Sequence, residues 1–147
     1  MKFCIEKFIQ LDIDKIFSVI SNQQNFKILL PETFSSIKLM SSRNKVCITE
    51  EHIRIFGNEK IITAKYIIDY PLSRKMFILG GDGKGSSIIE EYTKDKNRTK
   101  LILSINLKFN KFKFLKFFQK NKIYNEILYT VERLIKELEK PKTTFYL

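Results

Sequence analysis

The sequence is poor in the residues that cross-link a chain, bind metals or break regular structure. Its 147 residues include no tryptophan, one histidine, two cysteines, three prolines and five glycines. Cys4, Cys47 and His52 are too few, and too irregularly spaced, to supply the four ligands of a structural zinc site. We therefore predict neither a metal nor a cofactor, and we expect the two cysteines to be buried free thiols.

Long hydrophobic runs are also absent. The longest, such as ILL at 28–30 and FILGG at 77–81, are far shorter than the roughly 20 apolar residues that span a bilayer. Charged residues interrupt the N-terminal segment MKFCIEKFIQLD, which therefore lacks the apolar core of a secretory signal. We expect a cytoplasmic protein.

Four of the five glycines fall in one stretch, LGGDGKGS at 79–86. A phosphate-binding P-loop ends in Gly-Lys-Ser/Thr, whereas here Lys84 is followed by Gly85. The next residues, SSIIEEYT, are typical of a strand rather than of the helix that a P-loop opens. We predict that residues 80–85 form a turn and bulge, in which glycine adopts positive φ.

The composition that is present predicts a folded and basic protein. Apolar residues make up 44% of the chain and include 13 phenylalanines, which is enough for one continuous core. The 27 lysines and arginines exceed the 16 acidic residues, giving a net charge of +11. This charge favours anionic partners but does not choose among nucleic acid, acidic lipid and acidic protein, and a coding bias toward lysine explains it equally well.

The hydrophobic pattern predicts one strand, two short helices and then six further strands. The first strand covers 2–11, and the short helices cover 14–22 and 24–30. Short turns join the six strands, which must run antiparallel because parallel crossovers need a dozen residues or more. These six strands are predicted at 36–42, 45–56, 60–70, 75–81, 86–94 and 99–109.

A change to helical spacing marks the C-terminal part of the chain. From 112 to 140 the apolar residues recur with a helical period, and Pro141 ends the pattern. A helix of this length covers one whole face of a sheet. Since no linker or repeat divides the chain, we predict one domain at 1–140 and a C-terminal tail at 141–147.

This order of elements resembles the helix-grip fold of the superfamily that contains START, Bet v 1 and polyketide cyclase/dehydrase proteins (SRPBCC). The segments that carry the resemblance are DIDKIFSVISNQQNF, PLSRKMFIL, GGDGKGSSIIEEY and NRTKLILSINLKF. The resemblance implies an α+β fold, in which a curved antiparallel sheet of about seven strands wraps around the long C-terminal helix. Two short helices follow the first strand.

The same resemblance implies an elongated apolar cavity between the sheet and the helix. The implied function is to bind or transport a hydrophobic small molecule or lipid. A polyketide cyclase/dehydrase-like enzyme is the alternative, and we favour a non-enzymatic binding protein over it. A basic adaptor for nucleic acid or protein is a third possibility, which we do not favour. The sequence does not indicate an oligomeric state.

Strand alternation yields the candidate site. It places Thr49, Glu51 and Ile53 on one face and His52 on the opposite, solvated face. If the first face points at the helix, Glu51 is an acidic group beside an apolar cavity; the alternative is a position at the rim, paired with a lysine. Tyr66, Tyr70 and either Glu90 or Tyr92 are the polar groups that could join Glu51 at the cavity. In an enzyme, Glu51 or Tyr66 would be the acid/base. The predicted ligand-binding residues are Glu51, Tyr66, Tyr70, Ile89, Leu103, Ile105, Phe118, Ile127, Leu128 and Val131.

The segment LKFNKFKFLKFFQKNK at 107–122 interleaves lysines with phenylalanines. Such a segment suits an acidic membrane surface, near which each lysine contributes about 1 kcal/mol. The alternatives are phenylalanines packed on the sheet beside solvated lysines, and binding of single-stranded nucleic acid. The predicted membrane-surface residues are Lys111, Lys113, Lys116, Lys120 and Lys122.

Overall fold

Seven antiparallel strands form one curved sheet in the computed structural model, which describes residues 1–108, 111, 117–141 and 145. The strands lie in the order β1-β7-β6-β5-β4-β3-β2. Consecutive strands from β2 to β7 are neighbours, because their connections are too short for anything but an antiparallel turn. The strands are β1 (Lys2–Ile9), β2 (Phe34–Arg43), β3 (Val46–Ile55), β4 (Asn58–Asp69), β5 (Ser73–Gly81), β6 (Ser87–Asp95) and β7 (Arg98–Asn106).

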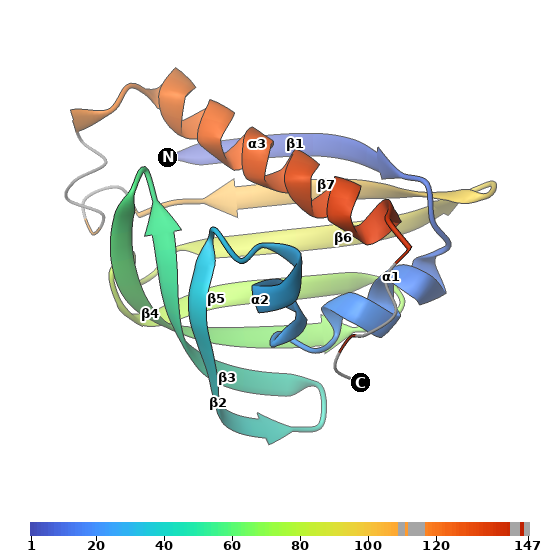
Figure 1. Ribbon diagram of the computed structural model, residues 1–147, viewed down its shortest axis with the longest axis horizontal. Coiled ribbons are helices and arrows are strands. Elements are labelled where there is room, and N and C mark those ends of the chain that lie inside the picture. Colours follow the sequence, from blue (N-terminus) through green and yellow to red (C-terminus); the bar gives the residue numbers. More distant parts are fainter. Residues whose placement is uncertain (109–110, 112–116, 142–144, 146–147) are drawn as a thin grey trace.

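Three helices lie on the same side of this sheet (Figure 1). The two short ones, α1 (Ile13–Ile20) and α2 (Asn25–Leu29), connect β1 to β2. The long one, α3 (Lys120–Glu139), lies across the concave face, and the sheet curves around it (Figure 1). The predicted α+β helix-grip architecture of about seven strands is therefore confirmed. No helix in the described part of the chain is long and apolar enough to cross a membrane.

The helix begins later than the sequence predicts. We expected it to start at residue 112, but α3 starts at Lys120, and the backbone of Gln119 is extended (φ −71°, ψ 152°). The Phe118 ring stacks on Phe56 in the β3–β4 turn, with centroids 4.3 Å apart, which holds Phe118 outside the helix. Residues 112–116 lie outside the described residues.

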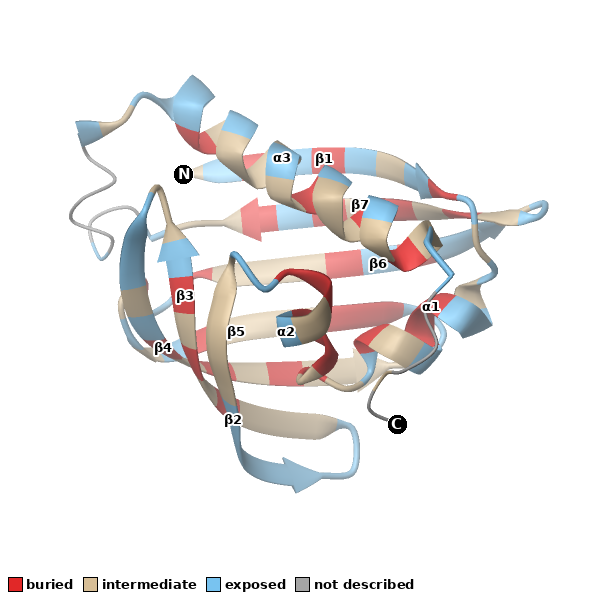
Figure 2. Cartoon of the chain, in the orientation of Figure 1, coloured by how far each residue is buried: buried red, intermediate tan, exposed pale blue. Residues whose placement is uncertain are grey.

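The core is made of apolar residues from the sheet and the helices. The buried positions lie where these two layers face each other (Figure 2). On α3 the buried residues Ile123, Val131, Ile135 and Leu138 share the side that faces the sheet, while the opposite side is exposed. Burial of each large apolar side chain contributes about 1.5–3 kcal/mol, and this is the main force that holds the helix against the strands.

The cysteines depart from their predicted burial. Cys4 is exposed, because β1 turns Phe3 and Ile5 inward and therefore turns Cys4 outward. Cys47 is half-buried, and burial raises the pKa of its thiol. Both are free thiols, as predicted.

The glycine-rich stretch forms the connection between β5 and β6, as predicted. The pairing of β4 with β5 shifts register where Thr63 faces Gly80 and Ala64 faces Ile78, which is a β-bulge next to this turn. Gly81 has a φ of +78°, and a Cβ atom there would lie 2.3 Å from the backbone oxygen of Ile61. The chain therefore requires glycine at 81, for both its conformation and its close approach.

We predict that Gly81→Ala lowers the free energy of unfolding by at least about 2 kcal/mol, because φ is strained and the clash is with backbone. Gly80→Ala is the matched control, since its added Cβ would make ordinary contact with Thr63 at 3.7 Å. It should be neutral or stabilise by about 0.5–1 kcal/mol. Urea denaturation measures the free energy of unfolding of both variants. Equal values for Gly81→Ala and Gly80→Ala would contradict the requirement for glycine at 81.

Candidate ligand-binding site

A cavity of about 240 Å³ lies between the concave face of the sheet and α3. Its volume is just below the range of about 300–1,000 Å³ that is typical of small-molecule pockets, so it suits a compact ligand. The walls are mostly aliphatic and come from β4, β5, β6 and β7, the end of β3, α3, and the segment 23–34 around α2. The apolar residues that face it include Ile53, Ile62, Met76, Ile78, Ile88, Leu103, Ile105, Ile123, Ile127, Val131 and Leu134.

Five of the predicted ligand-binding residues line this cavity. Leu103 and Ile105 lie on β7, Tyr66 lies on β4, and Ile127 and Val131 lie one helical turn apart on α3. Residues two apart on a strand and four apart on a helix share a face, which explains why these side chains meet at one cavity. That they bind a ligand stays a prediction.

Three other predicted residues lie outside the cavity lining. Ile89 points away from the cavity, because its neighbours Ile88 and Glu90 face inward on β6 and adjacent strand residues face opposite sides. Leu128 packs against the core beside the cavity, since adjacent helix residues point about 100° apart. Phe118 packs at the edge of the core, on Phe56.

Tyr70 is also displaced from its predicted place. The strand β4 ends at Asp69, so Tyr70 no longer follows the alternation that turns Tyr66 inward. Its side chain is 54% exposed, and its hydroxyl donates a hydrogen bond to Asp14. That hydrogen bond raises the pKa of Tyr70. Tyr70 therefore fixes α1 to the end of β4 rather than contacting the cavity.

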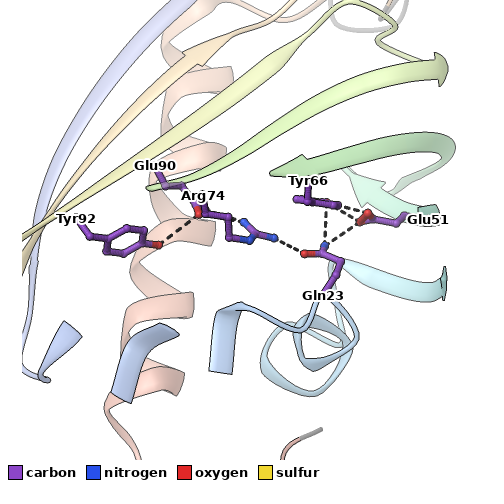
Figure 3. A network of polar contacts seen from close by, with 6 residues as sticks. All are labelled: Gln23, Glu51, Tyr66, Arg74, Glu90 and Tyr92. Carbon is purple, nitrogen blue, oxygen red and sulfur yellow. Dashed lines mark hydrogen bonds and ion pairs between the residues drawn. The ribbon is translucent and has the colours of Figure 1, made fainter. Parts of the chain in front are cut away.

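Six polar side chains form a connected network at one wall of the cavity, which we call the polar cluster (Figure 3). All are buried. Four of them line the cavity, whereas Glu51 and Tyr92 stand behind that lining. The cluster consists of Gln23, Glu51, Tyr66, Arg74, Glu90 and Tyr92.

Glu51 has no exposed surface and is held by three donors. The hydroxyl of Tyr66 donates to Glu51 Oε2 at 2.8 Å, Thr49 Oγ1 donates to the same oxygen at 2.6 Å, and Gln23 Nε2 donates to Oε1 at 3.2 Å. The alternative of a rim position paired with a lysine is therefore wrong. Burial, and next the charge of Glu51, raise the pKa of Tyr66 well above its usual value, so Tyr66 remains a donor.

Arg74 provides the positive charge of the cluster. Its Nη1 donates to both oxygens of Glu90 at 3.0 Å, and its Nη2 donates to Gln23 Oε1. The rings of Phe26 and Tyr66 cover the guanidinium, with centroids 4.4 and 4.6 Å from Cζ. Burial alone would lower the pKa of Arg74, but the Glu90 carboxylate together with Tyr66 and Tyr92 more than offsets burial and raises it, so the guanidinium stays charged.

Gln23 joins the two halves of the cluster through its amide. The oxygen accepts from Arg74, and the nitrogen donates to the Tyr66 hydroxyl at 2.8 Å and to Glu51. Glu90 in turn accepts a hydrogen bond from the Tyr92 hydroxyl at 3.3 Å. Since Gln23 lies between α1 and α2, this one side chain ties the helical connection to the strands of the cavity wall.

The sequence did not reveal Gln23 or Arg74. The predicted strands leave 71–74 as a turn, whereas β5 already begins at Ser73. Its alternation turns Arg74 inward with Met76 and Ile78. That alternation is a signal which could have identified Arg74. Gln23 lies in a short polar link, where no periodicity applies.

The structure describes three of the five predicted membrane-surface lysines. Lys111, Lys120 and Lys122 are exposed, and the Lys120 ammonium lies 5.7 Å from the centroid of the Phe3 ring. Lys113 and Lys116 lie outside the described residues. Contact with an acidic membrane stays a prediction.

Within the described ranges, no three acidic, histidine or cysteine side chains are grouped to hold a metal.

We predict that Arg74→Met destabilises the protein by about 3–5 kcal/mol, because it leaves Glu90 buried without its cation. Arg98→Met is the matched control. Arg98 pairs with Asp95 at 2.8 Å, but both side chains are more than a third exposed, so we expect a loss of about 1 kcal/mol or less. Chemical denaturation compares the two, and similar losses would contradict the structural role of the buried pair.

No family model and no curated protein match the sequence. Several solved structures, however, have a similar fold. TTHA0849 from Thermus thermophilus is 14% identical, with a TM-score of 0.75 over 95% of this chain and 94% of its own. Major latex-like protein 151 from Panax ginseng is 16% identical, with a TM-score of 0.73 over 96% and 98%. ZhuI aromatase/cyclase from Streptomyces sp. R1128 is 10% identical, with a TM-score of 0.72 over 95% and 93%. The chain therefore has the helix-grip fold of Bet v 1-like proteins and polyketide aromatase/cyclases.

Proposed function

We propose that this protein binds a compact hydrophobic small molecule in the cavity between the sheet and α3. The observation that carries the proposal is the cavity itself, whose aliphatic walls meet four convergent polar side chains at one place. Ligand sites are commonly built in this way, with apolar surface for affinity and a few polar groups for orientation. Each Å² of apolar ligand surface removed from water contributes about 25 cal/mol.

The size of the cavity narrows the ligand class. At about 240 Å³ it favours a molecule of two or three fused rings, or a short acyl chain, over a phospholipid with two long tails. Three of the similar structures are named as a latex-like protein, Ara h 8 and an aromatase/cyclase, and the fold is shared by all three. The proposal that this protein binds a small molecule depends on the cavity of this chain, and not on the names of those structures.

We predict that Ile127→Phe, which fills the cavity, weakens binding of the neutral fluorescent probe N-phenyl-1-naphthylamine by about tenfold or more. Leu128→Phe is the matched control, because Leu128 is the next residue of α3, is also half-buried and lies outside the cavity lining. The affinity of Leu128→Phe for the probe should differ from that of the wild-type protein by less than about twofold. Fluorescence titration measures both, with circular dichroism to verify folding. If the wild-type protein binds no probe, or both variants lose binding equally, the proposal is wrong.

A second candidate function, an enzyme of the cyclase or dehydrase type, is favoured by one observation. Tyr66 lines the cavity, and its hydroxyl donates to Glu51, which is not part of the lining. A substrate in the cavity would therefore contact a tyrosine whose hydroxyl is paired with a carboxylate, and such a pair can carry out general acid/base chemistry. Glu51 would be the base that takes up a proton passed through the Tyr66 hydroxyl.

If the protein is such an enzyme, Glu51→Gln and Tyr66→Phe should leave probe affinity within about twofold and lower the turnover of a poly-β-ketone substrate by about 100-fold or more. Mass spectrometry of the cyclised product measures turnover, and probe titration measures binding. Absence of turnover by the wild-type protein would reject the enzyme and leave the binding function standing.

A further inference from the structure

A second pocket adjoins the cavity, and we call it the polar pocket. Its volume is about 240 Å³, and it is formed by the end of α1, the link to α2, and strands β2 and β3. Hydroxyl and amide side chains such as Ser18, Asn22 and Ser42 make up much of its lining. Among the described residues, Gln23 alone lines both the cavity and the polar pocket.

The inward-facing residues of β3 show what separates the two spaces. Alternate residues of a strand share a face, so Cys47, Glu51 and Ile53 follow one another along the concave side. Cys47 lines the polar pocket and Ile53 lines the cavity. Glu51 stands between them, lines neither space and has no exposed surface. The buried Glu51 side chain therefore belongs to a partition between the cavity and the polar pocket.

The side chain of Gln23 completes this partition from the helical side (Figure 3). Its Nε2 donates to Glu51 on β3 at 3.2 Å and to the Tyr66 hydroxyl on β4 at 2.8 Å. Its Oε1 accepts a hydrogen bond from Arg74 on β5. Because these hydrogen bonds reach three neighbouring strands, they hold the amide across the gap between the α1–α2 link and the sheet.

We propose that Gln23 determines the length of the ligand that the cavity accepts, because its side chain closes the cavity against the polar pocket. A shorter side chain at this position would join two spaces of about 240 Å³ each into one elongated site. That site would accept a longer molecule with an apolar chain and a polar end. This inference rests on the proposed function, because it names the residue that sets the size limit of the same cavity.

The test measures how affinity depends on chain length in the series of 1-alkanols from butanol to dodecanol. Competition with N-phenyl-1-naphthylamine gives the dissociation constant of each alkanol. Each methylene that enters the cavity should strengthen binding about fourfold. Once the chain fills the cavity, further methylenes should add no affinity. The chain length at which the gain stops is the quantity compared between variants, and we call it the cutoff length.

We expect Gln23→Ala to increase the cutoff length by about two to four methylenes, because the space left by the amide is only partly refilled. Gln24→Ala is the matched control, since Gln24 is half-buried and lines the polar pocket but not the cavity. Its cutoff length should equal that of the wild-type protein.

An unchanged cutoff length in Gln23→Ala, or an equal increase in both variants, would overturn the inference while leaving the binding function intact. Failure of every alkanol to displace the probe from the wild-type protein would count against the proposed function itself.

A measurement that keeps Gln23 in place tests the inference even if Gln23→Ala does not fold. Cys47 is half-buried and lies in the polar pocket, beyond the partition. In Cys4→Ser it is the one remaining cysteine, so N-ethylmaleimide labels it alone. Saturating the cavity with the longest alkanol that still gains affinity should change the labelling rate of Cys47 by less than about twofold, because the ligand does not reach the thiol. Stronger protection would show that the ligand passes Gln23 and would overturn the inference.

Discussion

A buried positive charge organises the interior of this protein. The guanidinium of Arg74 lies in an apolar environment, where a charge is stable only if it is paired and hydrogen-bonded. Glu90 on β6 supplies the opposite charge, the amide of Gln23 supplies an acceptor, and two aromatic rings cover the faces. Satisfying this one side chain fixes neighbouring strands and the link between α1 and α2 relative to each other.

The same arrangement explains how polar groups come to face an otherwise apolar cavity. Four members of the polar cluster line the wall, but their charges are already balanced by neighbours within the cluster. The cavity can therefore present hydrogen-bonding groups without holding an isolated charge.

The sequence predicted the parts of the structure that follow a strict period. Strand alternation placed Leu103 and Ile105 on the inner face of β7, and helical spacing placed Ile127 and Val131 on the inner side of α3. The sequence did not set the inward face where two adjacent residues are both apolar, as at Ile88 and Ile89, or where a turn was expected. Ile89 was assigned with the wrong phase, and Arg74 was read as part of a turn. The bridge made by Gln23 depends on tertiary packing alone, so no local pattern indicates it.

The position of β1 has a consequence for the order of folding. This first strand pairs with the last one, β7, and the backbone of Met1 bonds to that of Leu107, 106 residues along the chain. Pairing over such a separation carries a large loop-closure entropy, and it cannot begin during synthesis until nearly all of the sheet has left the ribosome. The β2–β7 meander can assemble from local hairpins before that time. The first strand and α3, which packs beside it, should therefore be the last layer added, and their docking closes the cavity.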